Sequence, residues 1–463
     1  MSTEQILAII IFAAMFIAIM WGKIHRFVPA LIGAALTAIL ILTLVDHGPH
    51  NLWEVLRLPD FVDGHWWFGK HAADGVAEGT EVGGVNWQTM IFIGGMMVMV
   101  EGLGAAGFFR WLCLLVARLV KYRVVPILIT FMLLSAFLSM FIDSITVMLF
   151  LATVTIELAR LLKFDPVPVI IAEIFASNTG GSATMSGDPP NIIIGTHFRF
   201  TFMDFLTNTG VIAWICMIVV AVLFFLFFRK ALKKQASENP PKSSHQYPQP
   251  GEAIKNRRFF MLSTAIFVSV VVLLVTHAQT GLSVGLIGCI AAALSLGAVF
   301  LVAREQFRHV IGGVDWRTLL FFFGLFVCVG GLEVTGVLHD LSQLIGDASG
   351  ANLAIAMTFI LWVSAFASAI VDNIPFAATM CPVIASLSTD QGLAVRPLSW
   401  SLALGTDIGG NATPIGASAN VVGTAIAEKE GYRITWGRYC RYAVPAMLLV
   451  VGICNLYLVL RYA

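Results

Sequence analysis

Long apolar stretches recur along almost the whole chain and are separated by short polar segments. A helix of about 20 apolar residues is long enough to cross a bilayer, so each such stretch predicts a membrane span. We expect uninterrupted spans near 6–22, 27–45, 87–109, 210–228, 259–277, 282–302, 318–338 and 442–460, and interrupted spans near 167–196 and 398–427. The pattern predicts an all-α, polytopic membrane protein.

Two further apolar stretches, 124–162 and 353–385, each bend at a polar centre, "FIDSIT" and "IVDNIP". Segment 229–258 is rich in Pro and Ser and carries eight Lys or Arg residues, so we interpret it as a flexible cytoplasmic linker. If both bent stretches are re-entrant hairpins, 23 of the 28 basic residues lie on the linker's side. This charge bias favours hairpins and five crossings per half, with both termini outside.

An internal repeat relates the two halves of the chain at a constant offset of 229 residues. The offset aligns 85–107 with 314–336, 135–143 with 364–372, and 178–191 with 407–420. Five crossings is an odd number, so the halves are predicted to have opposite topology, as in many secondary transporters. We therefore divide the chain into a first repeat (1–228), the linker (229–258) and a second repeat (259–463).

The interruptions fall at corresponding places in the two halves, which points to a binding site. The backbone of "NTGGSATMSGDPPN" cannot face lipid, because its amide groups would go unpaired. We expect its polar side chains to bind cargo, and its glycines to contact cargo only through the main chain. The predicted binding positions are Asn178, Thr179, Gly180, Gly181, Thr184 and Asn191 in the first half, and Gly409, Gly410, Asn411, Thr413 and Asn420 in the second.

Four acidic residues are candidates for ion coupling. Asp143 and Asp372 are equivalent under the repeat and sit at the apices of the two hairpins. Burial in a membrane makes protonation of a carboxylate accessible, which favours a proton or cation site, although either residue could instead cap a half-helix. Asp188 and Asp407 have no acidic repeat partner, which suggests one shared site. No Lys or Arg falls in these segments, so we expect a neutral polyhydroxy solute or a small ion rather than a multivalent organic anion.

Composition and motifs argue against several other classes of protein. The chain is 58% hydrophobic and only 12% charged, with a net charge of +1, and this gives no indication of a nucleic-acid partner. Seven scattered cysteines predict buried thiols rather than a metal site or disulfides. An intramembrane aspartyl protease is a poor fit, since no G-x-G-D motif is present at either hairpin aspartate.

The stretches "GGSATMSGDPPNIIIGT", "FIDSITVMLF", "VDNIPFAATMCPV" and "GGNATPIGASANVV" resemble the ion transporter superfamily. The likeness is to the branch of arsenite permeases, the melanosomal P-protein and NhaD-type antiporters, and it covers about residues 20–460. It implies a scaffold domain, a mobile transport domain, and homodimers that work by an elevator-like shift. By resemblance, the site also includes the apex residues Ser144 and Asn373.

The same resemblance implies a cargo and a cellular setting. Its P-protein-like members include arsenite exporters, so we expect efflux of arsenite or antimonite, as neutral trihydroxides, across a bacterial inner membrane. Proton import through Asp143 or Asp372 would drive it, with no other cofactor, and an arsenical-pump ATPase subunit is a partner that the resemblance allows. Sodium–proton exchange and transport of an inorganic or small organic anion stay open as alternatives.

Overall fold

The computed structural model describes residues 1–45, 50–68, 83–238 and 247–463, and in these ranges all regular structure is helical. Nine of the described helices are long and apolar enough to cross a bilayer; they include Ser144–Leu162 and Leu353–Ile370, from the two bent stretches, whereas Phe27–Thr43 is shorter. The uninterrupted spans are α1 (Thr3–Trp21), α2 (Phe27–Leu36) continued by a π-helical segment (Thr37–Val45), α5 (Trp87–Ala105), α12 (Val211–Glu238), α13 (Arg257–Thr280), α14 (Val284–Val302), α16 (Trp316–Val334) and α22 (Trp436–Tyr462). The fold class predicted from hydropathy is confirmed.

Both bent stretches form helical hairpins, and both interrupted spans are broken helices. The hairpins are α7 (Val124–Ser139) with α8 (Ser144–Leu162), and α18 (Leu353–Ile370) with α19 (Asn373–Gln391). The broken helices are α9 (Val167–Gly181) with α10 (Pro189–His197), and α20 (Val395–Gly409) with α21 (Ser418–Lys429). Asp188 and its repeat equivalent Ala417 are extended, with φ of −145° and −141°, so each break ends in the same backbone conformation.

Two amphipathic helices were not expected from the sequence. The predicted spans 87–109 and 318–338 are too long at their carboxyl ends, because α5 ends at Ala105 and α16 at Val334. The chain then turns at Gly107 and Gly336, with φ of +87° and +78°, a conformation that favours glycine. The turns lead into α6 (Phe108–Leu119) and α17 (Val337–Ser349), which are equivalent under the repeat.

The segment predicted as a flexible linker is partly ordered. Its first ten residues, 229–238, continue α12 as helix. After the undescribed residues, Tyr247 stacks on Tyr122 with ring centroids 4.5 Å apart, and the Tyr122 hydroxyl donates to the Pro248 carbonyl at 2.8 Å. The prediction of a flexible loop is therefore wrong for 229–238, which is helical, while 247–249 has no regular structure but packs against Tyr122. The apolar pattern missed the helix because its exposed last turns are polar.

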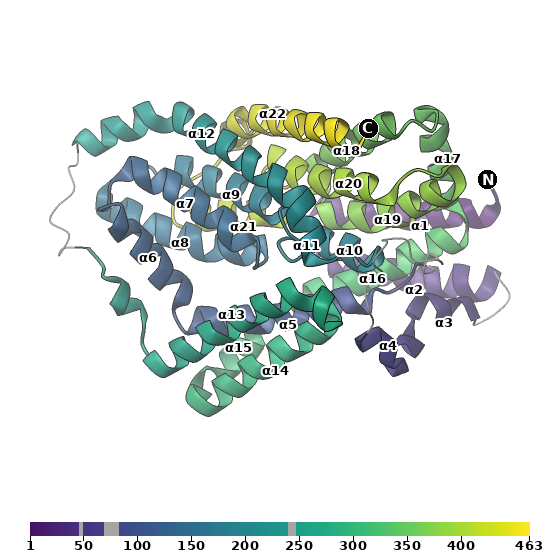
Figure 1. Cartoon of the computed structure of the whole chain (residues 1–463), viewed down its shortest axis with the longest axis horizontal. Coiled ribbons are helices and arrows are strands. Elements are labelled where there is room, and N and C mark those ends of the chain that lie inside the picture. The colour runs from purple at the N-terminus through teal and green to yellow at the C-terminus, as the bar shows by residue number, and fades with distance from the viewer. Residues whose placement is uncertain (46–49, 69–82, 239–246) are drawn as a thin grey trace.

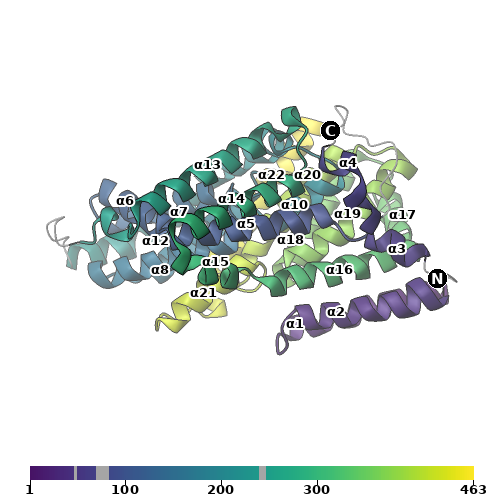
Figure 2. The ribbon, with the colours of Figure 1, turned by 90° about the horizontal axis from the view of Figure 1, so that it is seen from below.

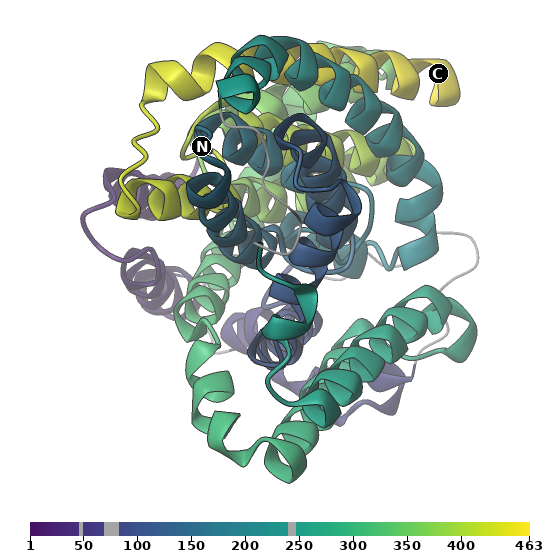
Figure 3. The ribbon, with the colours of Figure 1, turned by 90° about the vertical axis from the view of Figure 1, so that its left-hand side faces the viewer.

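The helices pack into two bodies, which we call the scaffold and the transport body. The scaffold contains α1, α2, α5, α13, α14 and α16, and the transport body contains α7–α10, α12 and α18–α22. Figure 1 shows α5, α13 and α14 in a lower layer beneath α7, α9 and α12, and Figure 2 shows α1 and α2 along one edge. In Figure 3 the α13–α14 pair stands beside the bulk of the transport body. The broken helices and hairpin tips all belong to the transport body.

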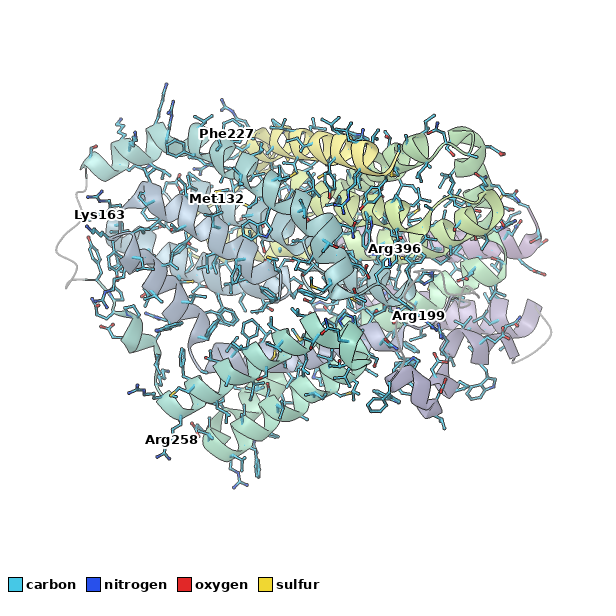
Figure 4. All side chains as sticks on the ribbon, in the orientation of Figure 1. Met132, Lys163, Arg199, Phe227, Arg258 and Arg396 are labelled. Carbon is cyan, nitrogen blue, oxygen red and sulfur yellow. The ribbon has the colours of Figure 1, made fainter. Side chains whose placement is uncertain are left out.

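Four basic residues labelled in Figure 4 lie on the sides that the predicted charge bias assigns to them. In Figure 4, Lys163 and Arg258, both expected inside, lie toward the left. Arg199 and Arg396, both expected outside, lie to the right of the centre. Figure 1 places both chain ends in its right half. The arrangement agrees with the predicted separation of the clusters, while the orientation of the chain in a membrane stays a prediction.

Candidate functional site

The two broken helices meet through asparagine side chains. The amide nitrogen of Asn178, in α9, donates to the Oδ1 atoms of Asn411 at 3.0 Å and Asn420 at 2.8 Å, both in the second half. All three side chains are buried. The prediction that segments 178–191 and 407–420 are interrupted and lie side by side is confirmed.

A second asparagine in each half closes the break in its own helix. The Nδ2 atom of Asn191 donates to the carbonyl oxygens of Gly181 and Thr184, both at 3.1 Å. The repeat-equivalent Asn420 makes the same two bonds in its half, at 2.8 and 2.7 Å. Because a carbonyl only accepts hydrogen bonds, these contacts fix which amide atom is the nitrogen. The Oδ1 atom of each asparagine therefore turns away from the break.

The predicted threonines use their hydroxyl protons within the protein. Thr184 and Thr413 donate to the carbonyl oxygens of Met140 and Ala369, at the tips of the two hairpins. Thr179 donates to a carbonyl one turn earlier in its own helix. These bonds attach each broken helix to its hairpin, so the threonines can offer cargo only the acceptor side of their oxygen atoms.

Gly180 and Gly409 let the broken helices lie directly against the hairpins. A Cβ atom on Gly180 would be 2.2 Å from the Ala136 carbonyl oxygen. The equivalent atom on Gly409 would be 2.3 Å from the Cα atom of Ala365. Both distances are far shorter than a carbon contact of about 3.5–4.0 Å. The interpretation of these residues as backbone-geometry positions is supported.

Glycines also face each other across each break. A Cβ atom on Gly187 would be 2.3 Å from the Gly181 carbonyl oxygen, and one on Gly416 would be 2.5 Å from that of Gly410. Sequence reasoning selected Gly181 and Gly410 but missed their partners. The signal was available, because Gly187 and Gly416 are identical under the offset of 229.

Asp188 connects the first broken helix to both hairpin tips. Its Oδ1 atom accepts a hydrogen bond from Ser144 at 2.8 Å, and its Oδ2 atom accepts one from the amide of Asn373 at 3.0 Å. Ser144 begins α8 and Asn373 begins α19, and all three side chains are buried. The residues that the family resemblance added to the site are thus in contact with its central carboxylate.

Asp407, on the other broken helix, is buried and close enough to Asp188 and Asn191 to interact with them electrostatically. Among the described residues, neither of its buried oxygen atoms has a partner in hydrogen-bonding geometry. Two adjacent buried carboxylates cannot both stay ionised without a large desolvation cost.

The second hairpin tip carries an ion pair that the sequence did not predict. The Asp372 carboxylate accepts from the Arg26 guanidinium at 2.7 Å, and the same nitrogen donates to Ser418 at 3.1 Å. The expectation of a site without Lys or Arg is therefore wrong. Asp143, the repeat equivalent of Asp372, forms no ion pair with any described residue, and its buried Oδ1 atom has no hydrogen-bond partner among them.

Arg26 gave no signal in the sequence. It follows the first apolar run and contributes to the basic residues expected inside. Its partners are distant in the chain, since Asp372 is 346 positions away and Thr318, to which it donates at 2.9 Å, is 292 away. Only the packing of the scaffold against the transport body brings them together.

Several buried polar atoms at the two breaks and the first hairpin tip have no hydrogen-bond partner within the described protein. Most of them are acceptors. They are the Oδ1 atoms of Asp143, Asn178 and Asn191, both carboxylate oxygens of Asp407, and a single donor, the Nδ2 atom of Asn411. A set so rich in acceptors suits a cation or a solute that donates hydrogen bonds, and suits a free anion poorly.

A cavity of about 370 Å³ lies between the scaffold and the transport body, away from Arg26. It is lined by Asn86 and Gln88 of α5, by Thr196 of α10 and by Cys381 of α19. Met185, in the first break, also lines it, while its neighbours in the chain are buried. The cavity therefore reaches the first broken helix without opening onto its carboxylates.

Comparison with known proteins gives a family and a fold. Residues 16–405 match the family described as citrate transporter. An uncharacterized transporter of Mycobacterium tuberculosis is 32% identical over 99% of both chains. The P protein of Homo sapiens is 28% identical over 98% of this chain and 60% of its own length.

Two solved transporter structures share the fold at low sequence identity. The YdaH transporter of Alcanivorax borkumensis superposes with a TM-score of 0.53 at 13% identity, covering 99% of this chain and 98% of its own. MtrF of Neisseria gonorrhoeae gives a TM-score of 0.54 at 11% identity, covering 100% and 95%. At such identities the likeness concerns the arrangement of helices alone.

Proposed function

The chain belongs to the citrate transporter family, within the ion transporter superfamily, and on that premise we propose that it is a proton-coupled secondary transporter. The family and the relatives are named as transporters, not enzymes. The observation that carries the proposal is that two buried carboxylates, Asp188 and Asp407, one from each broken helix, are close enough to interact electrostatically. In secondary transporters built from repeats, broken helices of this kind form the site for cargo and coupling ion.

Proton coupling follows from the cost of two neighbouring buried charges. With one proton shared between Asp188 and Asp407, the pair carries a single negative charge, which the Ser144 and Asn373 donors stabilise. Loss of that proton leaves two negative charges near each other. A cargo with several O–H donors would then stabilise both carboxylates by hydrogen bonds. Proton binding and cargo binding thus alternate, which is the requirement for exchange.

For cargo we propose arsenite or antimonite, carried outward as the neutral trihydroxide. Such a solute has three O–H donors and no charge. The acceptors of Asn178, Asn191 and Asp407 would receive those donors, and the Asn411 amide would contact a cargo oxygen. The transport body would carry the cargo past the scaffold in an elevator-like shift, and the family resemblance supports this mode of movement.

We also propose the cellular setting. The protein would reside in a bacterial inner membrane with both termini outside and the basic segment 229–258 in the cytoplasm, since basic residues concentrate on the cytoplasmic side. It would form a homodimer, and an arsenical-pump ATPase subunit would be an optional partner.

The test is arsenite uptake into inside-out vesicles with an imposed proton gradient, acidic inside. Wild-type protein should accumulate arsenite, and Asp188→Asn and Asp407→Asn should each abolish the gradient-driven part. Asp340→Asn, which changes an exposed carboxylate on α17, is the matched control and should transport like wild type. Gradient-driven uptake that survives in both site variants would refute proton coupling through this pair.

Two other cargoes have specific support. The oxygen-rich centre suits Na⁺, and sodium-dependent proton movement without arsenite movement would assign the protein to sodium–proton exchange. Arg26 and the family description suit a small carboxylate such as citrate. Citrate uptake that arsenite does not inhibit would show that the cargo is an anion. The same vesicles answer all three questions.

A further inference from the structure

Arg26 is bonded to both bodies of the protein at once. It stands at the N-cap of α2, in the scaffold. One guanidinium nitrogen donates to Asp372 at 2.7 Å and to Ser418 at 3.1 Å, both in the transport body. The other nitrogen donates to Thr318, at the start of scaffold helix α16, at 2.9 Å. The rigid fork of an arginine suits such a bridge, whereas a lysine presents only one point of charge.

The surroundings hold the guanidinium in this orientation. Thr318 donates in turn to Asp315 at 2.5 Å, and the Arg26 guanidinium lies over the Phe321 ring, 5.1 Å from its centroid. Ser418 also donates to Asp372, at 3.2 Å. The hairpin tip, the second broken helix and two scaffold helices therefore share one hydrogen-bonded network.

The network is accessible enough to open. The side chains of Arg26 and Asp372 are 26% and 17% exposed, so water can replace the bonds when the bodies separate. The first hairpin tip differs, because Arg26 acts on Asp143 only through a longer-range electrostatic interaction and forms its ion pair with Asp372. Of the two tips, as far as the structure describes them, the second alone is bonded to the scaffold by an ion pair.

We propose that Arg26 is a positioning residue that latches the second hairpin tip and the second broken helix to the scaffold. The latch holds the site against α2 and the start of α16, whereas the cavity beside α5 and α10 is lined farther along α16, at Phe326 and Val329. Movement of the transport body past the scaffold requires the two arms of Arg26 to part. This inference rests on the proposed transport function for its purpose, but its geometry is independent of the cargo.

Hydrogen–deuterium exchange of the purified full-length protein in detergent tests the latch without any cargo. In Arg26→Ala, amide exchange in the peptides spanning residues 370–376 should rise about tenfold, the effect of losing one charge-assisted hydrogen bond. The first tip, residues 141–147, interacts with Arg26 only through longer-range electrostatics at Asp143 and should change by much less than the second tip. Arg317→Ala is the matched control, because Arg317 precedes Thr318 in the first turn of α16 yet contacts His25 instead of the network.

A second variant keeps the test decisive if Arg26→Ala fails to fold. Thr318→Val retains the ion pair but removes the scaffold arm, together with the hydroxyl bond from Thr318 to Asp315, so exchange at 370–376 should rise about threefold, less than in Arg26→Ala because the ion pair stays. Unchanged exchange in Thr318→Val, or an equal rise in Arg317→Ala, would overturn the latch. In the vesicle assay, Arg26→Lys should slow transport at saturating cargo and leave the half-saturating concentration unchanged.

The outcomes separate the latch from the proposed function. If wild-type vesicles move neither arsenite nor protons, the proposed function fails, while the exchange comparison still decides whether Arg26 restrains the tip. If transport is proton-coupled but Arg26→Ala exchanges like wild type, the latch fails and the proposed function stands.

Discussion

Replacing Gly409 with alanine tests whether the broken helix lies against its hairpin as closely as the structure indicates. The added Cβ atom would be 2.3 Å from the Ala365 Cα atom and 2.4 Å from its carbonyl oxygen. Restoring an ordinary carbon contact requires α18 and α20 to separate by roughly 1.2 Å. Backbone atoms cannot rotate away, so we expect a loss of about 2–3 kcal/mol, in the upper part of the range for overpacked cores.

Gly297→Ala is the control for this substitution. Gly297 is also inside a helix, α14, but nothing lies within 4 Å of its added Cβ atom. There the alanine should stabilise the protein by about 0.4–1 kcal/mol, because it reduces the freedom of the unfolded chain. The two variants make the same chemical change and are predicted to act in opposite directions.

Thermal unfolding in detergent, followed with a thiol-reactive dye, measures the difference. Five cysteines are buried and become reactive only when the helices part: Cys113, Cys216, Cys328, Cys381 and Cys454. The prediction of buried thiols is wrong for Cys289, which is exposed, and for Cys440, which is half-buried, so their reaction is subtracted as the signal before unfolding. For a chain of this length the loss corresponds to a fall of about 2–3 °C in Tm, compared at one scan rate. A Gly409→Ala protein that unfolds at or above the Gly297→Ala temperature would refute the close packing of α18 on α20.

Three further predictions concern the buried centre. Asp188→Asn and Asp407→Asn should be non-additive in vesicle transport, because either change alone already removes the shared proton site; rates of the double variant measure this. Asn420→Ala should destabilise the protein by about 2 kcal/mol in thermal unfolding, since it leaves two buried carbonyl groups unpaired. Glu173→Gln should unfold within about 1 kcal/mol of wild type, because glutamine keeps the bond to Thr155, which is 2.5 Å long in the structure; a larger loss in the same assay would show that Glu173 needs its charge.

Hydropathy and the repeat together predicted most of the fold. Apolar length defined the spans, since crossing a bilayer demands it. The offset of 229 identified which interruptions correspond, and the structure repeats their hydrogen bonds: Asn191 and Asn420 close equivalent breaks. The hairpins followed from the distribution of charge, which depends on loops rather than on packing.

What the sequence did not reveal depends on tertiary contacts or on single backbone angles. The turns at Gly107 and Gly336 end two spans early, and an apolar window continues smoothly across both. The partner of the Arg26 side chain depends on how the two bodies pack, because Asp372 is 346 positions away in the chain. No local pattern carries that information, so the site was expected to lack a cation.

The two halves repeat the same helices and breaks, but their acidic residues occupy different positions of the repeat. Asp188 corresponds to Ala417, and Asp407 corresponds to Asn178, so each half contributes one acid at a different position of its break. Although the positions differ, the two acids lie in one buried centre and interact electrostatically. A single carboxylate pair can share one proton, and this favours one coupling site per chain over two independent ones.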